Sequence, residues 1–279
     1  LLKSDTFPTY ALAAMVDDLD MKISHILRGH DWLPSTPIHL LVLRYLQPKG
    51  ELPAIGHLTD IMSPNTGKKL SKRRDSVFCE QYLEQGYLPE ALLNFVALLG
   101  WSPKDNRELF TLPELVTVFD EKGFQDTNPR FFLDKLNWFN GQYLRGKSDA
   151  ELLPLLRPFA PATASDELLL QIIPLAKTRI SLLSDFTPLT EFFFAAPAPV
   201  TFSEVDLGYL AVAREILAKV AWDKTSIESE LVSSVKAKGW KNMDFFAALR
   251  ISITGKKISP PLTESMLILG REVVLSRLP

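Results

Sequence analysis

A short basic segment is the part of the sequence best suited to chemistry on an anion. Residues 68–74 contain five lysines and arginines within seven positions, directly after a Pro-Asn-Thr-Gly turn at residues 64–67. Glycine and a small serine allow the backbone to approach a ligand closely, and backbone N–H groups can join the lysines around phosphate oxygens. The segment therefore fits a triphosphate whose charge distribution changes during a reaction. A solvated basic turn without a ligand is the alternative that charge alone leaves open.

A second candidate is Arg28, which ends a short apolar run at residues 24–27. The run predicts a strand, and Thr36 as N-cap with Pro37 at the first helical position predicts a helix to about Leu46. Strand, polar turn and helix place side chains at the carboxyl end of a parallel strand, where α/β proteins bind ligands. A guanidinium at that edge can hold a carboxylate through two hydrogen bonds.

From about residue 76 the hydrophobic pattern becomes helical. The stretch at residues 195–199, Ala-Ala-Pro-Ala-Pro, cannot form a regular helix and predicts a linker. Other seams are expected at residues 63–67 and 145–149, and no internal repeat of solenoid length is present. Helices are predicted to start at Leu88-Pro89-Glu90 and at Asn128-Pro129, and the first of them to stop at Gly100. Two more are predicted from capping boxes, Thr111 with Glu114 and Thr225 with Glu228, and the second of these is predicted to stop at Gly239.

Composition limits the class of protein. The 279 residues are 46% hydrophobic and 23% charged with a net charge of −2, which is ordinary for a soluble globular protein, so any nucleic-acid site must come from local charge clusters. The one cysteine, Cys79, excludes an intrachain disulfide and is expected to be a buried apolar residue. No apolar run approaches the ~20 residues of a membrane span. The chain starts at Leu1 without a signal-peptide pattern, and we expect its natural amino terminus to lie upstream.

The motifs taken together resemble those of the glutamyl-tRNA synthetases, a bacterial-type family of class I aminoacyl-tRNA synthetases. Residues 69–73, Lys-Leu-Ser-Lys-Arg, resemble the family's lysine-rich signature loop. The resemblance extends in order and spacing over essentially the whole chain. Its other segments are Phe-Pro-Thr-Tyr at 7–10, Val-Asp-Asp at 16–18, His-Ile-Leu-Arg-Gly at 25–29 with Trp32, Ser-Thr-Pro at 35–37, 86–94, 136–143, Leu249-Arg250, Thr254-Gly255 and Pro-Pro-Leu at 260–262.

The resemblance implies roles for residues of the first half. Lys72, with Lys69, would contact the phosphates of ATP and offset the charge that builds as glutamate attacks the α-phosphorus. Arg28 would hold the side-chain carboxylate of glutamate, with the Tyr10 hydroxyl as a further partner. The residues that would line the adenosine are Trp32, Ile61, Met62 and Leu70.

The resemblance also implies anticodon contacts in the second half, from Arg179, Arg250 and Leu262. Arg179 is expected in a helix that continues past Pro174, and Leu262 in a loop. RNA loops are read through splayed bases by stacking and base-edge hydrogen bonds. Residues 236–257 carry six basic side chains against one acidic, Asp244, which suits phosphate contacts, although a solvated basic face is the alternative.

Three positions depart from the family pattern. After Tyr10 the family commonly has a histidine and, four positions beyond the tyrosine, an asparagine of the substrate site. Here these positions are Ala11 and Ala14, so one polar contact to the amino acid is absent or is supplied by another residue. His30 stands where an acidic residue is usual, and we assign it no role.

The fold that the resemblance implies is mainly α with an N-terminal α/β part. Residues 1–64 would be the carboxyl-terminal half of a Rossmann-type catalytic domain, and residues 65–148 the signature loop and a helical stem-contact domain. Two anticodon-binding helical bundles would follow, in residues 149–191 and 192–279. The implied reaction joins glutamate to tRNA(Glu) through glutamyl-adenylate, with ATP accompanied by Mg²⁺ and with no tightly bound cofactor or metal. We expect a cytoplasmic monomer that has no membrane contact.

Three other assignments remain open at this stage. The family's shortened paralogue, which glutamylates a modified base of tRNA(Asp), lacks an anticodon-binding region, and residues 149–279 argue against it. The glutaminyl enzyme has a β-barrel anticodon region, whereas this one is predicted to be helical. A non-enzymatic helical RNA-binding or interaction protein is the alternative from a different class. Whether tRNA(Gln) is also charged stays open, although Arg179 favours discrimination.

One further expectation concerns the chain by itself. The family's His-rich signature motif and its acceptor-end insertion domain are not found among the 279 residues. We therefore expect this chain alone to bind tRNA without charging it. Glutamate-dependent and tRNA-dependent pyrophosphate exchange by the 279-residue chain would contradict that expectation.

Overall fold

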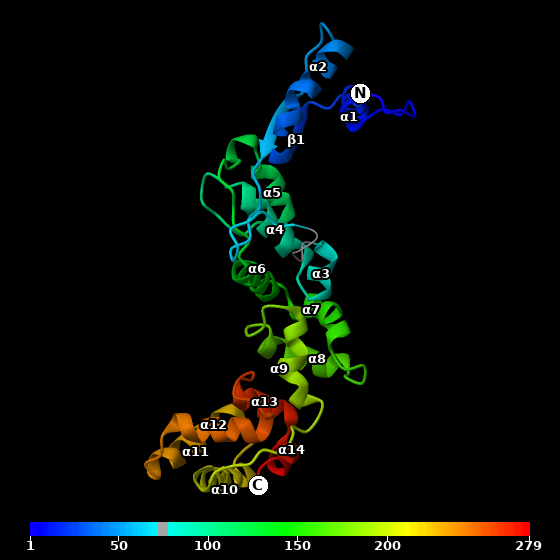
Figure 1. Cartoon of the computed structure of the whole chain (residues 1–279). Helices are drawn as coiled ribbons and strands as arrows, with labels where there is room; N and C mark the ends of the chain where they lie inside the picture. Colours follow the sequence, from blue (N-terminus) through cyan, green and yellow to red (C-terminus); the bar gives the residue numbers. More distant parts are fainter. Residues whose placement is uncertain (72–77) are drawn as a thin grey trace. The chain divides into compact units, whose positions relative to one another are not determined.

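The computed structural model describes residues 1–71 and 78–279. The chain forms two compact units, of which the first comprises Leu1–Phe78 and Leu92–Leu133 and the second Cys79–Ala91 and Asp134–Pro279. Within the described residues, helices predominate and a single two-stranded sheet lies near the amino terminus (Figure 1). The prediction of a mainly α fold with an N-terminal α/β part is therefore confirmed.

The first unit is built on a parallel strand pair flanked by helices. Strand β1 pairs with β2 so that Arg28 lies opposite His57. Helices α1 and α2 pack together through Met15, Val42 and Leu43, the buried centre of a small core. The elements of this unit are α1 (Tyr10–Asp20), β1 (His25–Gly29), the 3₁₀ helix η1 (His30–Ser35), α2 (Thr36–Leu46), β2 (Ala54–Leu58), most of α4 (Pro89–Gly100), α5 (Leu112–Val118) and η2 (Glu121–Gly123).

The strand and the helix predicted around Arg28 are confirmed, but the predicted cap at Thr36 is wrong. Ser35 occupies the N-cap position, and Thr36 is the first residue of α2. The Thr36 hydroxyl instead bonds the Trp32 carbonyl at 3.0 Å and accepts a hydrogen bond from Arg28. A hydroxyl that caps no backbone N–H is thus available to a neighbouring side chain.

The helix predicted to start at Asn128-Pro129 begins later, at Leu133. The Asn128 side chain accepts a hydrogen bond from the Asp60 backbone N–H at 2.9 Å. The Met62 N–H donates to the Pro129 carbonyl, and the Phe131 N–H donates to the Met62 carbonyl. Because this segment pairs with the chain around Met62, its backbone groups are not available to a helix.

The second unit consists of helices around two apolar clusters. One cluster lies among α7, α8 and α9, and the other among α10 to α14. The elements of this unit are α3 (Cys79–Glu84), most of α6 (Leu133–Gly146), α7 (Asp149–Leu156), η3 (Arg157–Phe159), α8 (Asp166–Ala176), η4 (Leu183–Asp185), α9 (Phe186–Thr190), η5 (Glu191–Phe193), α10 (Glu204–Lys219), α11 (Lys224–Ala237), α12 (Asn242–Thr254), α13 (Leu262–Leu269) and α14 (Arg271–Ser276).

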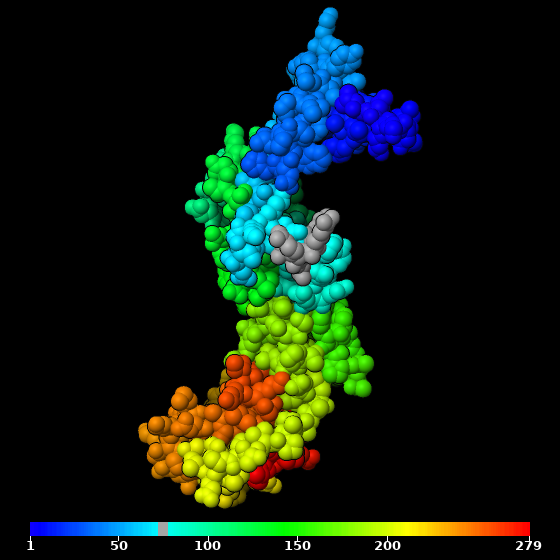
Figure 2. Space-filling view, viewed as in Figure 1, coloured from blue at the N-terminus to red at the C-terminus, as the bar shows by residue number. Residues whose placement is uncertain are grey.

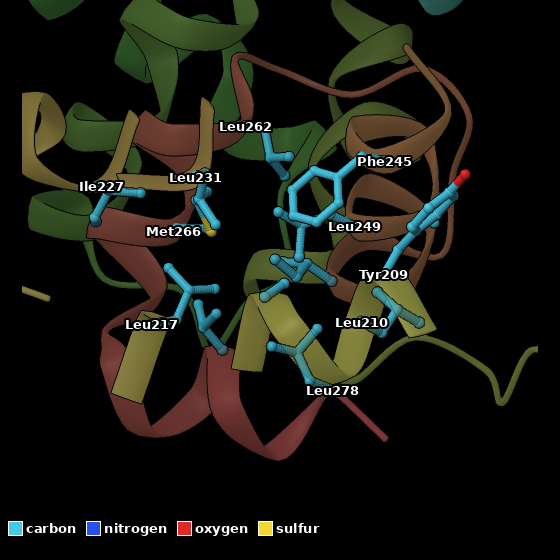
Figure 3. Packing of buried hydrophobic residues seen from close by; sticks show 14 of the residues in the cluster. Tyr209, Leu210, Leu217, Ile227, Leu231, Phe245, Leu249, Leu262, Met266 and Leu278 are labelled. Carbon is cyan, nitrogen blue, oxygen red and sulfur yellow. The ribbon is translucent and has the colours of Figure 1, made fainter. Parts of the chain in front are cut away.

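The cluster among α10 to α14 has Phe245 at its centre. Its ring is fully buried among Leu249, Leu262 and Tyr209, as Figure 3 shows. Helices α10, α12, α13 and α14 present adjoining surfaces, coloured yellow to red in Figure 2. Residues 195–203 form no helix or strand, so the Ala-Pro stretch is not helical, as predicted, while its role as a linker stays a prediction.

Two motif segments from the sequence pack against each other within the second unit. The buried Asn140 side chain accepts from the Leu88 N–H at 2.7 Å and donates to the Ser181 carbonyl. The Tyr87 hydroxyl donates to the Asn137 side chain, and burial raises the pKa of Tyr87 to about 12. Buried polar groups are therefore paired, and they fix residues 86–88 against α6.

Local capping signals were only partly reliable. The capping box of Thr111 and Glu114 is present, with both reciprocal hydrogen bonds. The box predicted at Thr225 is wrong, because α11 is capped two residues earlier by Asp223, whose carboxylate accepts from the Ser226 N–H at 2.9 Å. That hydrogen bond lowers the pKa of Asp223. A carboxylate accepts more strongly than a hydroxyl and also complements the helix dipole.

The expectation that Cys79 is buried is wrong. Cys79 is the first residue of α3, and its side chain is exposed. Exposure of the thiol alone assigns no role to Cys79.

Arg277 joins segments of the second unit that lie far apart in the sequence. Its guanidinium donates to the Ile253 carbonyl of α12 and to the Phe192 carbonyl of η5, each at 2.8 Å. We expect Arg277→Met to lower the free energy of unfolding by about 3–6 kcal/mol, since the two shortest of its three hydrogen bonds, each from a charged group, are lost. Urea unfolding followed by tryptophan fluorescence measures the change. Lys219→Met, at an exposed position of α10, is the control, and equal stability of the two variants would contradict the expectation.

Candidate functional site

Arg28 lies at the centre of a polar cluster in the first unit. Its Nη1 is 2.7 Å from Nδ1 of His39, and its Nη2 donates to the Thr36 hydroxyl at 2.8 Å. Its Nε points at Nε2 of His57 over 3.4 Å. These partners come from α2 and β2, so the strand pairing and the packing of α2 together orient the guanidinium.

The two histidines beside Arg28 are held in the neutral form. Burial, and then the positive charge of Arg28, lower the pKa of His39, while Asp18 opposes them. Burial and Arg28 likewise lower the pKa of His57, with a smaller contribution from His30. Both effects disfavour a second positive charge next to a guanidinium. The cluster therefore carries the single charge of Arg28 near neutral pH.

An aromatic pair lies beside this cationic centre. The rings of Tyr10 and Trp32 stack with their centroids 4.5 Å apart, and Arg28 Cζ is 6.0 Å from the centre of the Trp32 ring. Both rings are exposed, with Tyr10 at 54% and Trp32 at 37% of their full surfaces, so a ligand can reach them. The structure thus brings together three predicted site residues from α1, β1 and η1.

The predicted nucleotide-contacting residues of the basic loop share one small turn. Met62 pairs with Lys69 in an antiparallel bridge, and the Leu70 N–H donates to the Ile61 carbonyl at 2.9 Å. The turn between them passes through Gly67, whose φ of +64° lies in the left-handed region that glycine adopts without strain. Ile61, Met62 and Leu70 are therefore neighbours, as a shared apolar wall requires.

Lys69 ties this turn to the segment that carries Trp32. Its ammonium group contacts Asp60 at 2.9 Å and also bonds Asp31, the residue before Trp32. The hydrogen bonds that the ammonium group donates to these two carboxylates raise the pKa of Lys69, so its side chain is cationic. Lys72, the other predicted catalytic lysine, lies outside the described residues.

Several residues of this site were missed by sequence reasoning. His39, His57 and Asp60 had no assigned role, yet each contacts a predicted site residue. The sequence contains one indication of His39, because this polar residue interrupts the apolar run of α2. In the structure its side chain is only 1% exposed. A buried polar residue requires a partner, and that partner is Arg28.

Two of the three departures from the family pattern, Ala11 and Ala14, lie on α1. Ala14 packs against the apolar core of α1 and α2, and Ala11 is half-buried on the same helix. Neither side chain can form a polar contact, so an amino-acid ligand would rely on Tyr10 and Arg28 on this side of the site.

The second unit brings together two of the three predicted RNA-contacting residues. Arg250 donates to the Ser259 hydroxyl and to the Pro260 carbonyl. Burial, and then the positive charge of Arg179, lower the pKa of Arg250, so Arg179 acts electrostatically on Arg250. The prediction that Arg179 lies in a helix is wrong. Helix α8 ends at Ala176, and Arg179 lies in the turn that follows, where its N–H donates to the Ala176 carbonyl. That turn is fixed by Lys177, whose ammonium group bonds Asp149 at 2.8 Å.

The predicted loop position of Leu262 is wrong. Leu262 is the first residue of α13, is 7% exposed and points into the apolar cluster of Figure 3. Apolar burial explains this position, because the α11, α12 and α13 helices enclose it. Within the basic segment 236–257, Lys256 is paired with a carboxylate, whereas Lys238 stays exposed. Lys256 pairs internally with Glu191 at 2.7 Å, and the Lys238 ammonium lies 5.3 Å from the centre of the Trp240 ring.

Comparisons with known proteins agree with both units. Residues 1–138 match the family described as tRNA synthetases class I (E and Q), catalytic domain, and residues 151–279 match the anticodon binding domain. A glutamate–tRNA ligase of Treponema denticola is 36% identical over 100% of this chain and 62% of its own length. The chain belongs to the glutamate–tRNA ligase family. Another ligase of this family, from Herpetosiphon aurantiacus, is 37% identical over 100% of this chain and 59% of its own length.

A solved structure of the family superposes on nearly the whole chain. The glutamate–tRNA ligase of Elizabethkingia meningosepticum, whose crystal structure is a complex with its amino acid, has a TM-score of 0.84 at 32% identity. The match covers 99% of this chain and 60% of that chain. The chain thus spans about 60% of the length of the curated relatives it matches.

Membrane-spanning helices and clusters of metal ligands are both absent from the described part of the chain. None of its helices combines the length and the apolar character that crossing a membrane demands. No cluster of three or more histidine, cysteine or acidic side chains suited to a metal ion occurs among the described residues.

Proposed function

We propose that the protein containing this chain attaches glutamate to tRNA(Glu) through glutamyl-adenylate, with ATP and Mg²⁺ as co-substrates. The observation that carries the proposal is the arrangement of Arg28 beside the exposed Tyr10 and Trp32 rings. A guanidinium held by neutral partners offers a carboxylate-binding site, and exposed rings suit a planar base or an amino acid. Membership of the glutamate–tRNA ligase family supports this choice of substrate.

In this mechanism Arg28 binds the side-chain carboxylate of glutamate, and the Tyr10 hydroxyl adds a further contact. Trp32 lies against the adenosine, while Ile61, Met62 and Leu70 form the wall beside the base. The α-carboxylate of glutamate then attacks the α-phosphorus of ATP, and pyrophosphate leaves. Positioning of the two reactants supplies much of the rate acceleration.

The basic loop acts on the phosphates. Lys69 is cationic but is paired with Asp31 and Asp60, so we propose that it positions the basic loop and reaches the phosphates when it leaves these carboxylates. Lys72 is proposed to contact the phosphates as their negative charge increases. Mg²⁺ enters with ATP and is held by the nucleotide rather than by a resident metal site of this chain.

The second unit is proposed to bind the anticodon. Arg179 and Arg250 would read base edges through hydrogen bonds, and Leu262, although buried, would set the position of the adjoining residues 259–261. We propose the domain division into residues 1–64, 65–148, 149–191 and 192–279 on this functional basis. tRNA(Glu), ATP and glutamate are the proposed partners, and the monomeric state and cytoplasmic location remain predictions.

Substitution of Lys72 tests the enzymatic assignment. We expect Lys72→Ala, made in the protein with its complete natural sequence, to lower kcat for tRNA(Glu) charging by about a hundredfold, since a cation in the transition state is lost. Charging with radiolabelled glutamate measures the effect, and Lys49→Ala, an exposed lysine after α2, is the control. Unchanged charging by Lys72→Ala would exclude this role of Lys72, whereas absence of charging by the wild type would favour a non-enzymatic RNA-binding protein.

A further inference from the structure

The protonation state of His39 follows from its contact with Arg28. A guanidinium carries only donors, so the 2.7 Å contact between Arg28 Nη1 and His39 Nδ1 requires an unprotonated Nδ1. His39 is only 1% exposed. The imidazole is therefore the neutral tautomer with its proton on Nε2, and it acts as a hydrogen-bond acceptor.

The remaining hydrogen bonds of Arg28 define which of its N–H groups are occupied. Nη1 uses one N–H on His39, Nη2 uses one on Thr36, and Nε points at His57. Each terminal nitrogen carries two hydrogens, so Nη1 and Nη2 each keep an N–H that these three contacts do not use. Two N–H groups on adjacent nitrogens match the two oxygens of a carboxylate.

We propose that His39 is a positioning residue for the acidic substrate. Its neutral imidazole holds Arg28 so that the two remaining N–H groups receive the side-chain carboxylate of glutamate. The inference rests on the proposed function and deepens it, because it assigns substrate selection to a residue that does not touch the substrate. It also makes glutamate binding dependent on pH.

The surroundings of His39 set the direction of that dependence. The groups that face it are Arg28 from β1, Asp18 and Tyr10 from α1, and Trp32 from η1. On the far side of Arg28 lies His57 from β2. Protonation of His39 would place an N–H donor against an N–H donor of Arg28, and the nearby Asp18 charge only partly opposes the burial and the Arg28 charge that keep His39 neutral.

Protonation of His39 at low pH is expected to weaken glutamate binding. A histidine whose pKa is lowered in the folded protein is neutral at pH 7 and becomes protonated only below its ordinary value of about 6.5. The glutamate side chain stays ionised there, because its pKa is about 4.3. Glutamate binding should therefore weaken as pH falls from about 7 toward 5, through loss of the acceptor on His39.

A matched pair of substitutions tests the proposal in the protein with its complete natural sequence. His39→Leu replaces the acceptor with an apolar side chain of similar size. In His39→Asn, the Oδ1 atom of the asparagine can occupy the place of Nδ1. We expect the KM for glutamate to rise about tenfold to a hundredfold in His39→Leu, the range for a hydrogen bond to a charged group. His39→Asn should recover most of that loss, while kcat and the KM for ATP change less than about twofold.

The pH profile separates positioning from a general structural effect. We expect the wild-type KM for glutamate to rise between pH 7 and pH 5, and the rise to be smaller in His39→Asn, because an amide does not titrate there and only His57 beside Arg28 still does. His25→Asn, an exposed histidine at the start of β1, is the control and should keep the wild-type profile. Equal KM values for the Leu and Asn variants, or an unchanged profile in His39→Asn, would overturn the proposal. Failure of the wild type to charge tRNA with glutamate would instead contradict the proposed function.

Discussion

Replacement of Arg28 by glutamine is expected to lower kcat/KM for glutamate by about a thousandfold. Two charge-assisted hydrogen bonds to the substrate carboxylate are lost, and each contributes about 1.5–3 kcal/mol to a bound charge. The KM for ATP should change little, since Arg28 contacts the Trp32 ring only at 6.0 Å. Steady-state charging of tRNA(Glu) at varied glutamate concentration measures the change.

Two further variants decide how Arg28 acts. Arg28→Lys keeps the charge but loses the planar arrangement of donors, so it should recover only a small part of the activity. Arg44→Gln is the matched control, because Arg44 is exposed on α2 and forms only two hydrogen bonds, each of 3.4 Å, to backbone carbonyls. A full recovery by Arg28→Lys would show that charge alone suffices. An effect of Arg44→Gln equal to that of Arg28→Gln would remove Arg28 from the site.

The elements around Arg28 could be predicted from the sequence because their signals are local. An apolar run, a polar turn and a Thr-Pro pair are each read within a few residues, and they place β1 and α2 correctly. The same holds for the capping box of Thr111 and Glu114, whose two partners lie within one helical turn. Local hydrogen-bonding and propensity are sufficient to decide such cases.

The errors arose where a distant segment decided the structure. Residues 128–132 have a plausible helix start, but pairing with Met62 holds them extended. Leu262 follows two prolines and looks like a loop residue, yet the apolar cluster of the second unit buries it. Tertiary burial outweighs a local preference that is worth a fraction of a kcal/mol per residue.

The site itself was predicted in part. The resemblance to a family named Tyr10, Arg28 and Trp32, and the structure brings them together. Spacing in the sequence does not reveal the partners that orient them, because His57 approaches Arg28 from β2 and Asp60 approaches Lys69 from the segment after that strand. A buried histidine in an apolar helix was the one local indication that a charged partner existed.

The second large effect is expected in the helical unit. The double variant Arg179→Ala, Arg250→Ala should bind tRNA(Glu) about a hundredfold to a thousandfold more weakly, because each arginine is proposed to read a base edge at about 1–3 kcal/mol. The positive charge of Arg179 contributes to the lowered pKa of Arg250, which supports testing the two arginines together. Filter binding of tRNA(Glu), and of a tRNA(Glu) with a changed anticodon, measures the loss.

The discrimination between these two RNAs distinguishes base reading from simple charge attraction. If the arginines read bases, the double variant should bind both RNAs almost equally, with little change in the slope of affinity against salt concentration. Lys219→Ala removes an exposed charge from α10 and should preserve the discrimination. Arg250 also bonds Ser259 and Pro260, so the unfolding midpoint of each variant must be compared with that of the wild type. A variant that stays folded and keeps its preference for the natural anticodon would show that these arginines do not read it.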